Sequence, residues 1–271
     1  MGRFKSMQGR VRDIARSLVV RRTRGWCPIC ECSVRFVEVG PWLRDQLLCS
    51  RCGSIPRFRA LVHVLQTRFP NWREIRIHES SPGGRASEKL ARECRQYTPT
   101  HFFPNVEAGE LKNGIRCENL ERQTFPDACF DLVVTGDVFE HVLDPGRGFS
   151  EIARTLRPGG AHVFTLPWYW WKETLVRARR KESGKLEYLE KPDYHGNPID
   201  KKGSLVVTEW GLDLCDFIYR NSGLTTTALL IRDVKLGLAG EFCEVFISAK
   251  RKGAANGRPS DGVLASRVGA A

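Results

Sequence analysis

The sequence predicts an α/β protein built on a Rossmann-like, mostly parallel sheet of seven strands. Short apolar runs of strand length alternate with segments whose apolar residues recur every three or four positions. One run, residues 130–135, is predominantly apolar, as expected of a strand buried on both faces. Alternating strands and helices form a parallel sheet covered on both faces, and such sheets bind ligands beyond the carboxyl ends of their strands.

The strands and helices follow from this alternation. Two adjacent glycines, Gly83 and Gly84, follow the first strand, and Pro158 with two glycines ends the helix before the fifth. Gly223 closes the last helix, and the final two strands are expected to form an antiparallel pair at one edge of the sheet. Strands are expected at 74–78, 98–103, 114–117, 130–135, 161–166, 224–231 and 241–249, and helices at 57–69, 86–94, 149–156 and 209–222.

Composition divides the chain into four parts. Residues 1–24 are a basic, partly helical lead-in, and residues 25–56 hold five of the ten cysteines. Residues 57–250 form the α/β domain, in which 167–205 is an irregular, aromatic insertion after the fifth strand. Residues 251–271 are rich in Gly, Ala and Ser and are expected to be a disordered tail.

The net charge of +12 lies mainly at the two ends. Residues 1–24 carry +7 and residues 251–271 carry +3, which leaves +2 for the body of the chain. Basic ends of this kind bind RNA, acidic lipid or a partner, or serve as solvated tails. No window is apolar enough for a membrane span, and the N-terminus carries no apolar region typical of a secretory signal. Five of the ten cysteines fall between Cys27 and Cys52 and the others are scattered, which favours a reducing cytoplasm with one metal site over a disulfide framework.

Four cysteines predict a structural zinc site. Cys27 and Cys30 form one C-x-x-C pair, Cys49 and Cys52 form a second, and eighteen residues separate the pairs. Two such pairs supply four thiolates to one tetrahedral ion and leave no open coordination position. Cys32 is a spare thiol that could replace one of the four. A metal-free cluster of buried cysteines, or a redox pair, is the alternative.

Residues 74–250 resemble the class I S-adenosylmethionine (SAM) dependent methyltransferases, with a type 11-like domain. The most specific stretch runs from residue 125 to 160 and includes Asp131, Asp137, Glu140 and His141. The cysteine pairs, together with residues 53–61, resemble a subset of these enzymes that has an N-terminal zinc-ribbon-like element. The resemblance implies the class I methyltransferase fold, SAM as the methyl donor and methyltransferase activity.

The donor site implied by the resemblance lies at successive strand ends. Glu79 after the first strand could hold the ammonium group of SAM, and Gly83 and Gly84 allow the backbone to approach its methionine part. In the family an acid usually ends the second strand and binds the ribose. This sequence has none there, so His101 or Asn105 could substitute. After the third strand, Asn119 and Leu120 match the adenine-binding position.

The acceptor side is expected around Asp137, at the end of the fourth strand, which also lies near the donor. Asp137, His141 and His195 are the candidate bases for a hydroxyl acceptor. Asp137 and His141 would share one face if the turn is helical. In ubiquinone-pathway relatives the matching segment binds a divalent metal, which would place one on Asp137, Glu140 and His141. The alternative is that Glu140 and His141 tie the helix to the loops.

The sequence thus predicts methyl transfer to an oxygen or nitrogen of a small molecule or glycan. Trp168 to Trp171 would form an aromatic wall, and the insertion would be a lid over the acceptor. An RNA methyltransferase is the first alternative, favoured by the basic ends. A non-catalytic SAM-fold binding protein is the second, favoured by the altered glycine motif and the missing ribose acid. The sequence leaves the oligomeric state open.

Overall fold

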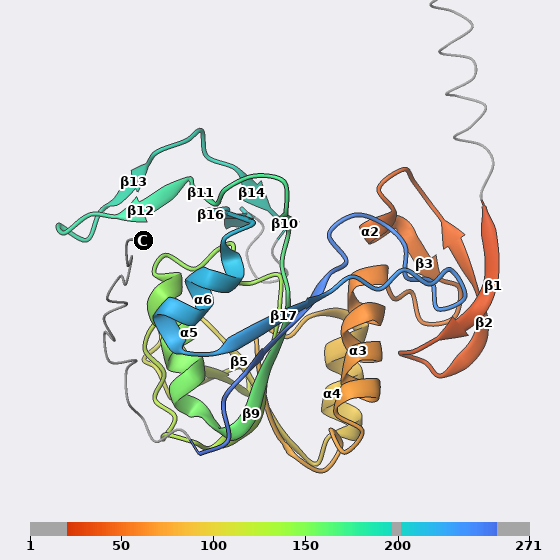
Figure 1. The fold of residues 1–271 in the computed structure, drawn as a ribbon, viewed down its shortest axis with the longest axis horizontal. Helices are drawn as coiled ribbons and strands as arrows, with labels where there is room; N and C mark the ends of the chain where they lie inside the picture. The colour runs from red at the N-terminus through yellow and green to blue at the C-terminus, as the bar shows by residue number, and fades with distance from the viewer. Residues whose placement is uncertain (1–20, 197–201, 254–271) are drawn as a thin grey trace, which may run out of the picture.

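The computed structural model describes residues 21–196 and 202–253. Most of the predicted lead-in and tail, residues 1–20 and 254–271, therefore lie outside the described residues. In the described residues, the chain forms a central sheet, helices on both of its faces, an N-terminal cysteine module and a set of short strands from the insertion (Figure 1). No helix in these two stretches is both long and apolar enough to cross a membrane.

The central sheet has the mostly parallel character that the sequence predicts. The described residues give eight strands in the order β17-β18-β9-β8-β4-β5-β7-β6. The pairs β9-β8, β8-β4, β4-β5 and β5-β7 are parallel, and the other three pairs are antiparallel. The strands are β4 (Arg76–Ser80), β5 (Gln96–His101), β6 (Leu111–Lys112), β7 (Ile115–Cys117), β8 (Phe130–Gly136), β9 (Leu156–Thr165), β17 (Thr225–Leu229) and β18 (Val245–Ala249).

Helices cover both faces of this sheet. Helices α3 (Pro56–Arg68) and α4 (Gly84–Glu93) lie on one side, and α5 (Pro145–Thr155) and α6 (Leu214–Ser222) lie on the other (Figure 1). A separate cluster of buried apolar side chains fills each interface. Leu61 and Leu65 of α3 pack in one cluster with Ile77 of β4, and Phe149 of α5 and Ile218 of α6 pack in the other. Strand β8 lies between these two layers, which explains why its sequence is apolar on both faces.

Three predicted elements differ in the structure. The seven-stranded sheet gains an eighth strand, because Asn113 and Gly114 turn the chain into a β6-β7 hairpin in left-handed conformations. The turn expected after α5 is instead the irregular start of β9, where the pairing with β8 shifts register. The helix expected at 209–222 is divided into strand β16 (Thr208–Gly211) and the shorter α6. Gly223 closes α6 with a φ of 71°, as predicted.

The cysteine module is a small antiparallel sheet packed beside α3. It contains β1 (Arg22–Cys27), β2 (Cys32–Glu38), β3 (Leu47–Cys49) and the short helix α2 (Leu43–Gln46). Its first strand begins at Arg22, within the last residues that the sequence assigns to the lead-in. A late segment of the chain covers the module: Trp26 N–H donates to Lys235 O over 2.7 Å, and Phe36 packs against Gly237.

The insertion forms several short strands above the carboxyl ends of the central strands (Figure 1). Strand β16 pairs with two of them, β10 and β11, and the others form two hairpins. The predicted insertion is therefore an ordered layer in the part that the structure describes. Its strands are β10 (Trp168–Tyr169), β11 (Leu175–Val176), β12 (Ala178–Arg180), β13 (Leu186–Tyr188), β14 (Tyr194–His195) and β15 (Ser204–Leu205).

Candidate functional site

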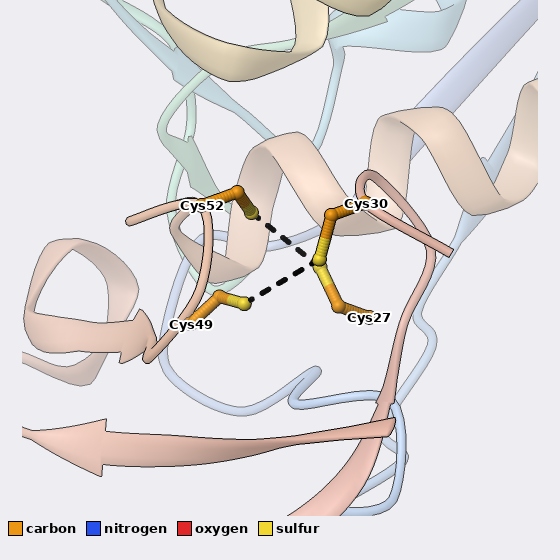
Figure 2. A group of neighbouring side chains, drawn as sticks. All are labelled: Cys27, Cys30, Cys49 and Cys52. Atoms are coloured by element: carbon orange, nitrogen blue, oxygen red, sulfur yellow. Dashed lines mark hydrogen bonds between the residues drawn. The ribbon is translucent and has the colours of Figure 1, made fainter. Parts of the chain in front are cut away.

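The four predicted cysteines converge on one point. Cys27 ends β1 and Cys30 lies in the turn before β2, while Cys49 ends β3 and Cys52 lies in the turn after it (Figure 2). The Sγ atoms of Cys27 and Cys52 are 3.8 Å apart, as are those of Cys30 and Cys49. Four sulfurs at about 2.3 Å from one zinc ion would be separated by about 3.8 Å, so the donor set fits tetrahedral zinc.

The surroundings of the cluster support thiolate ligands. The guanidinium group of Arg59 is buried beside the sulfurs, where it donates to Leu47 O over 2.9 Å and to Gly237 O over 2.7 Å. Burial lowers the pKa of Arg59 to about 10, so it stays charged at neutral pH. Cys32 is not a member of the cluster, because its thiol donates to the backbone carbonyl of Cys30 over 2.8 Å.

A second site is formed where the parallel strands end. Because β8, β4, β5 and β7 are parallel neighbours, their carboxyl ends meet along one edge of the sheet. All the residues that the sequence assigns to the cofactor lie at these ends or in the segments that follow them. They are Glu79, Gly83 and Gly84 at β4, Asn105 after β5, Asn119 and Leu120 after β7, and Asp137 after β8.

Glu79 is a buried carboxyl group with two hydroxyl donors. Ser87 Oγ donates to one of its oxygens over 2.7 Å, and the Tyr97 hydroxyl donates to the other over 2.5 Å. Burial raises the pKa of Glu79 to about 7, although both hydrogen bonds favour the ionised form. The group is therefore poised to ionise near neutral pH, for example when a cationic ligand arrives.

The two glycines after β4 differ in their roles. Gly84 has a φ of 72°, and a Cβ there would lie 3.2 Å from the ring of Phe58. Gly136, at the end of β8, faces the same ring, at 3.3 Å. The ring of Phe58 therefore packs close to both glycines, and a side chain at Gly84 would be disfavoured by its left-handed backbone and by this ring. Gly83 has open space where a Cβ would be, so it is the glycine that a ligand can approach.

The two candidates for the ribose contact lie in different environments. His101 is the last residue of β5 and is buried, and burial lowers its pKa. Asn105 follows in an exposed turn. After β7, Leu120 is buried, while the side chain of Asn119 accepts a hydrogen bond from Glu121 N–H over 2.9 Å. Asn119 thus stabilises the turn at the position where the sequence places adenine.

Asp137 is held by two arginines that the sequence analysis did not assign to the site. Arg44 of α2 donates to its carboxylate over 2.7 Å, and Arg57 at the start of α3 lies 3.0 Å away. Thr165 donates to the second oxygen over 2.8 Å. Although burial alone would raise the pKa of Asp137, the guanidinium groups of Arg44 and Arg57 hold it below its usual value.

The segment directly after Asp137 is not helical. Asp137 has a φ of 53°, and residues 137–144 form turns that lead into α5, so the predicted helix face shared with His141 does not exist. The metal set of Asp137, Glu140 and His141 is not brought together either, because Asp137 faces the arginines. Instead, the structure gathers Glu140, His141 and His195, whose potential ligand atoms all lie within 4.8 Å of one another.

The predicted aromatic wall divides into two parts. Trp168 packs on Phe246 and donates to Gly211 O over 2.7 Å, so it belongs to the core. The other aromatic residues form an exposed cluster that connects the insertion to the cysteine module. In this cluster Phe242 is within 6.2 Å, centroid to centroid, of each of Trp42, Tyr169 and Trp171, and Trp170 stands against Trp171.

Arg44, Arg57, Phe58 and Trp42 were missed from the sequence. For Arg57 and Phe58 the only signal was the stretch 53–61 that follows the second cysteine pair, which carried a resemblance but no assigned role. Arg44 and Trp42 lie before this stretch and had no such signal.

This fold and these clustered strand ends define a Rossmann-like α/β protein with a candidate cofactor site at the carboxyl edge of its sheet. Residues 80–164 match the family model of a methyltransferase domain. A probable S-adenosylmethionine-dependent methyltransferase of Mycolicibacterium smegmatis is 40% identical over 63 residues, which make up 23% of this chain and 24% of the relative. The chain thus matches about a quarter of the length of that curated relative. These matches support a SAM-dependent methyltransferase.

Solved structures with a similar fold include two methyltransferases. A SAM-dependent methyltransferase of Mesorhizobium loti aligns with a TM-score of 0.46 and 17% identity, over 71% of this chain and 98% of that one. The 1,6-didemethyltoxoflavin-N1-methyltransferase of Burkholderia thailandensis, solved with its substrate and S-adenosylhomocysteine, aligns with a TM-score of 0.43 and 15% identity, over 72% and 78%. At these values neither structure identifies an acceptor for this chain.

Proposed function

We propose that this protein is a SAM-dependent methyltransferase that methylates an oxygen or nitrogen atom of a small-molecule or glycan acceptor in the cytoplasm. The observation that carries the proposal is the coincidence of two features. The segment that matches a methyltransferase domain, residues 80–164, is the segment that builds the carboxyl ends of β4, β5, β7 and β8. The predicted cofactor residues lie at those same strand ends or in the segments that follow them.

The donor side accounts for the charged and polar parts of SAM. Glu79 would take the ammonium group, with the open backbone at Gly83 beside the methionine part. Asn119 and Leu120 would border the adenine, and His101 or Asn105 would contact the ribose. Arg44 and Arg57 add a positive region near Asp137, to which the carboxylate of the methionine part is complementary. Asp137 is then a positioning residue that fixes both guanidinium groups.

The acceptor side is formed by the exposed aromatic cluster and the histidines of the turn and insertion. Flat apolar faces such as Trp42 and Trp171 suit the ring of a sugar or a heterocycle. Methyl transfer to a hydroxyl needs a proton acceptor, and burial lowers the pKa of both His141 and His195, which keeps them neutral at pH 7. Asp137 is a poorer base, because two arginines stabilise its ionised form.

The cysteine module would hold one structural zinc ion on Cys27, Cys30, Cys49 and Cys52. The tetrahedral spacing of the sulfurs and the neighbouring Arg59 support this assignment. The ion would supply folding free energy to a module with few apolar residues of its own. None of the ten cysteines, all of which lie in the described residues, forms a disulfide, which accords with a reducing compartment.

Two measurements test the proposal. Titration calorimetry should show one molecule of SAM, and of S-adenosylhomocysteine, bound per chain. Incubation with isotope-labelled SAM and a cell extract should transfer label to a product whose mass identifies the acceptor class. A chain that binds SAM without transferring label to any extract would be a non-catalytic binding protein, and a chain that does not bind SAM would refute the proposal. Label in RNA would replace the small-molecule acceptor by nucleic acid.

A further inference from the structure

Glu140 is a buried carboxyl group for which the structure provides no hydrogen bond. Its side chain is 2% exposed, and neither Oε1 nor Oε2 has a hydrogen-bond partner among the described residues. A carboxylate in such a place is costly unless a charge or several donors compensate it. The backbone carbonyl of Glu140 accepts from Val207 N–H and Thr208 N–H, which fixes the turn in position.

Two imidazoles face this carboxyl group. The Nε2 atom of His141 lies 3.8 Å from Glu140 Oε1, and the Nδ1 atom of His195 lies 3.9 Å from the same oxygen. These separations are too long for hydrogen bonds. Ligand atoms at about 2.0–2.2 Å from a shared ion are about 3 Å apart when they are adjacent, so a shift of under about 1 Å would bring both nitrogens into range.

The orientation of His141 is that of a metal ligand. Its Nδ1–H donates to the backbone carbonyl of Leu205 over 2.8 Å, so the lone pair of the neutral ring is on Nε2, the atom that faces Glu140. Histidine ligands are usually fixed in this way, through a hydrogen bond from the nitrogen that does not bind the ion. The ring of His195 meets that of His141 edge to face, with 5.4 Å between the centroids.

We propose that Glu140, His141 and His195 bind one divalent first-row transition metal ion, distinct from the ion of the cysteine module. Two imidazoles and one carboxylate form a donor set for zinc, manganese, iron or cobalt. Three protein ligands leave positions open for water or an acceptor oxygen, unlike the four cysteines. The site joins the turn after β8 to strand β14 of the insertion, so a bound ion would fasten the insertion over the carboxyl edge.

The ion would also serve the proposed methyl transfer. An acceptor hydroxyl bound at an open position would have a lower pKa, so the cation would replace a free imidazole as the group that activates it. Metal binding itself does not depend on the methyltransferase assignment, because it is measured without SAM or acceptor. Loss of either conclusion therefore leaves the other standing.

The test is a titration of the purified protein that already holds one zinc ion per chain. Added Co²⁺ should bind as one further equivalent and give d–d absorption without thiolate charge-transfer bands. His195→Ala, whose side chain is 41% exposed and easily replaced, should weaken Co²⁺ binding at least about tenfold. Glu140→Gln and His141→Ala should do the same, while His63→Ala in α3 is the matched control and should bind like the wild type.

Two outcomes would overturn the proposal. One is the absence of a second equivalent of Co²⁺ in the wild type, and the other is unchanged Co²⁺ affinity in both His195→Ala and Glu140→Gln. Circular dichroism melts show whether each variant is folded, and if Glu140→Gln fails to fold, His195→Ala decides the question. Calorimetry with SAM on the same samples reports separately on the proposed function.

Discussion

The guanidinium group of Arg44 lies 2.7 Å from the carboxylate of Asp137. The two residues are 93 positions apart and belong to different parts of the fold, since Arg44 is in α2 of the cysteine module and Asp137 follows β8. Arg44 also donates to Phe242 O over 2.9 Å. The module is therefore a structural component of the candidate site, and whatever disturbs the module is expected to disturb the site.

Replacing Arg44 with alanine should destabilise the protein by about 3 kcal/mol, because it leaves the mostly buried Asp137 with one fewer guanidinium partner. The free energy of unfolding in urea measures the change. The double variant Arg44→Met with Asp137→Asn should recover part of the loss, since it removes both charges together. Equal stability of Arg44→Ala and the wild type would show that Arg57 alone is sufficient for Asp137.

Removal of the zinc ion should unfold the cysteine module. Elemental analysis should find one zinc per chain, and Cys49→Ser should lose it and lower the melting temperature markedly, because metal binding supplies folding free energy to the module. Cys32→Ser is the matched control and should keep both zinc and stability, since the Cys32 thiol bonds to a backbone carbonyl. Full zinc content in Cys49→Ser would contradict the assignment.

The pKa of Glu79 makes stability depend on pH in a defined direction. Burial raises this pKa from 4.5 to about 7, so the folded state favours the neutral form. Its contribution is fully present below about pH 4.5 and is lost as the pH rises through about 7, by up to about 1.4 kcal/mol per pH unit. Glu79→Gln should therefore gain on the wild type between pH 5 and pH 7.5, as urea unfolding would measure.

Glu88→Gln, on the exposed face of α4, is the control and should follow the wild type at every pH. SAM gives a second measurement, because a Glu79 that binds its ammonium group must ionise. SAM affinity should then rise with pH through about 7 in the wild type and lose this rise in Glu79→Gln. A stability difference between Glu79→Gln and the wild type that stays constant across this range would contradict the raised pKa.

Asn119→Ala should weaken SAM binding by about 1–2 kcal/mol, because a buried hydrogen bond to the adenine would be lost. The side chain also accepts from Glu121 N–H, so the turn itself loses a bond. Asn119→Asp separates the two effects, since it keeps an acceptor oxygen for the turn and for the adenine amino group, and it should bind SAM more tightly than the alanine variant. Unchanged affinity in Asn119→Ala would move the adenine site elsewhere.

Local patterns predicted the sheet and the cysteine cluster well. Strand β8 was found because burial on both faces leaves a mostly apolar run, and the cysteine pairs were found because each C-x-x-C turn is itself local. The division of 209–222 into β16 and α6 was missed, since Thr208–Gly211 is held by pairing with β10 and β11, which no spacing within the segment reveals.

The candidate site was harder to predict, because its contacts connect distant segments. Arg44 and Arg57 were not assigned, since nothing near them in the sequence indicates that Asp137 is their partner. Gly84 was assigned to the ligand from its local sequence, which gives no sign that the ring of Phe58, 26 residues earlier, packs close to it. His195 was a candidate base, but its position beside Glu140 depends on the folding of the whole insertion.

The hydrogen bond from Arg59 to Gly237 O has a consequence for synthesis of the chain. Arg59 is fully buried, and one of its acceptors belongs to a residue that the ribosome makes 178 positions later. Until that segment emerges, the module lacks both this carbonyl and the Lys235 carbonyl that receives Trp26 N–H. A nascent chain can thus gather its cysteines early, but it completes the module only when nearly all of the α/β domain has left the exit tunnel.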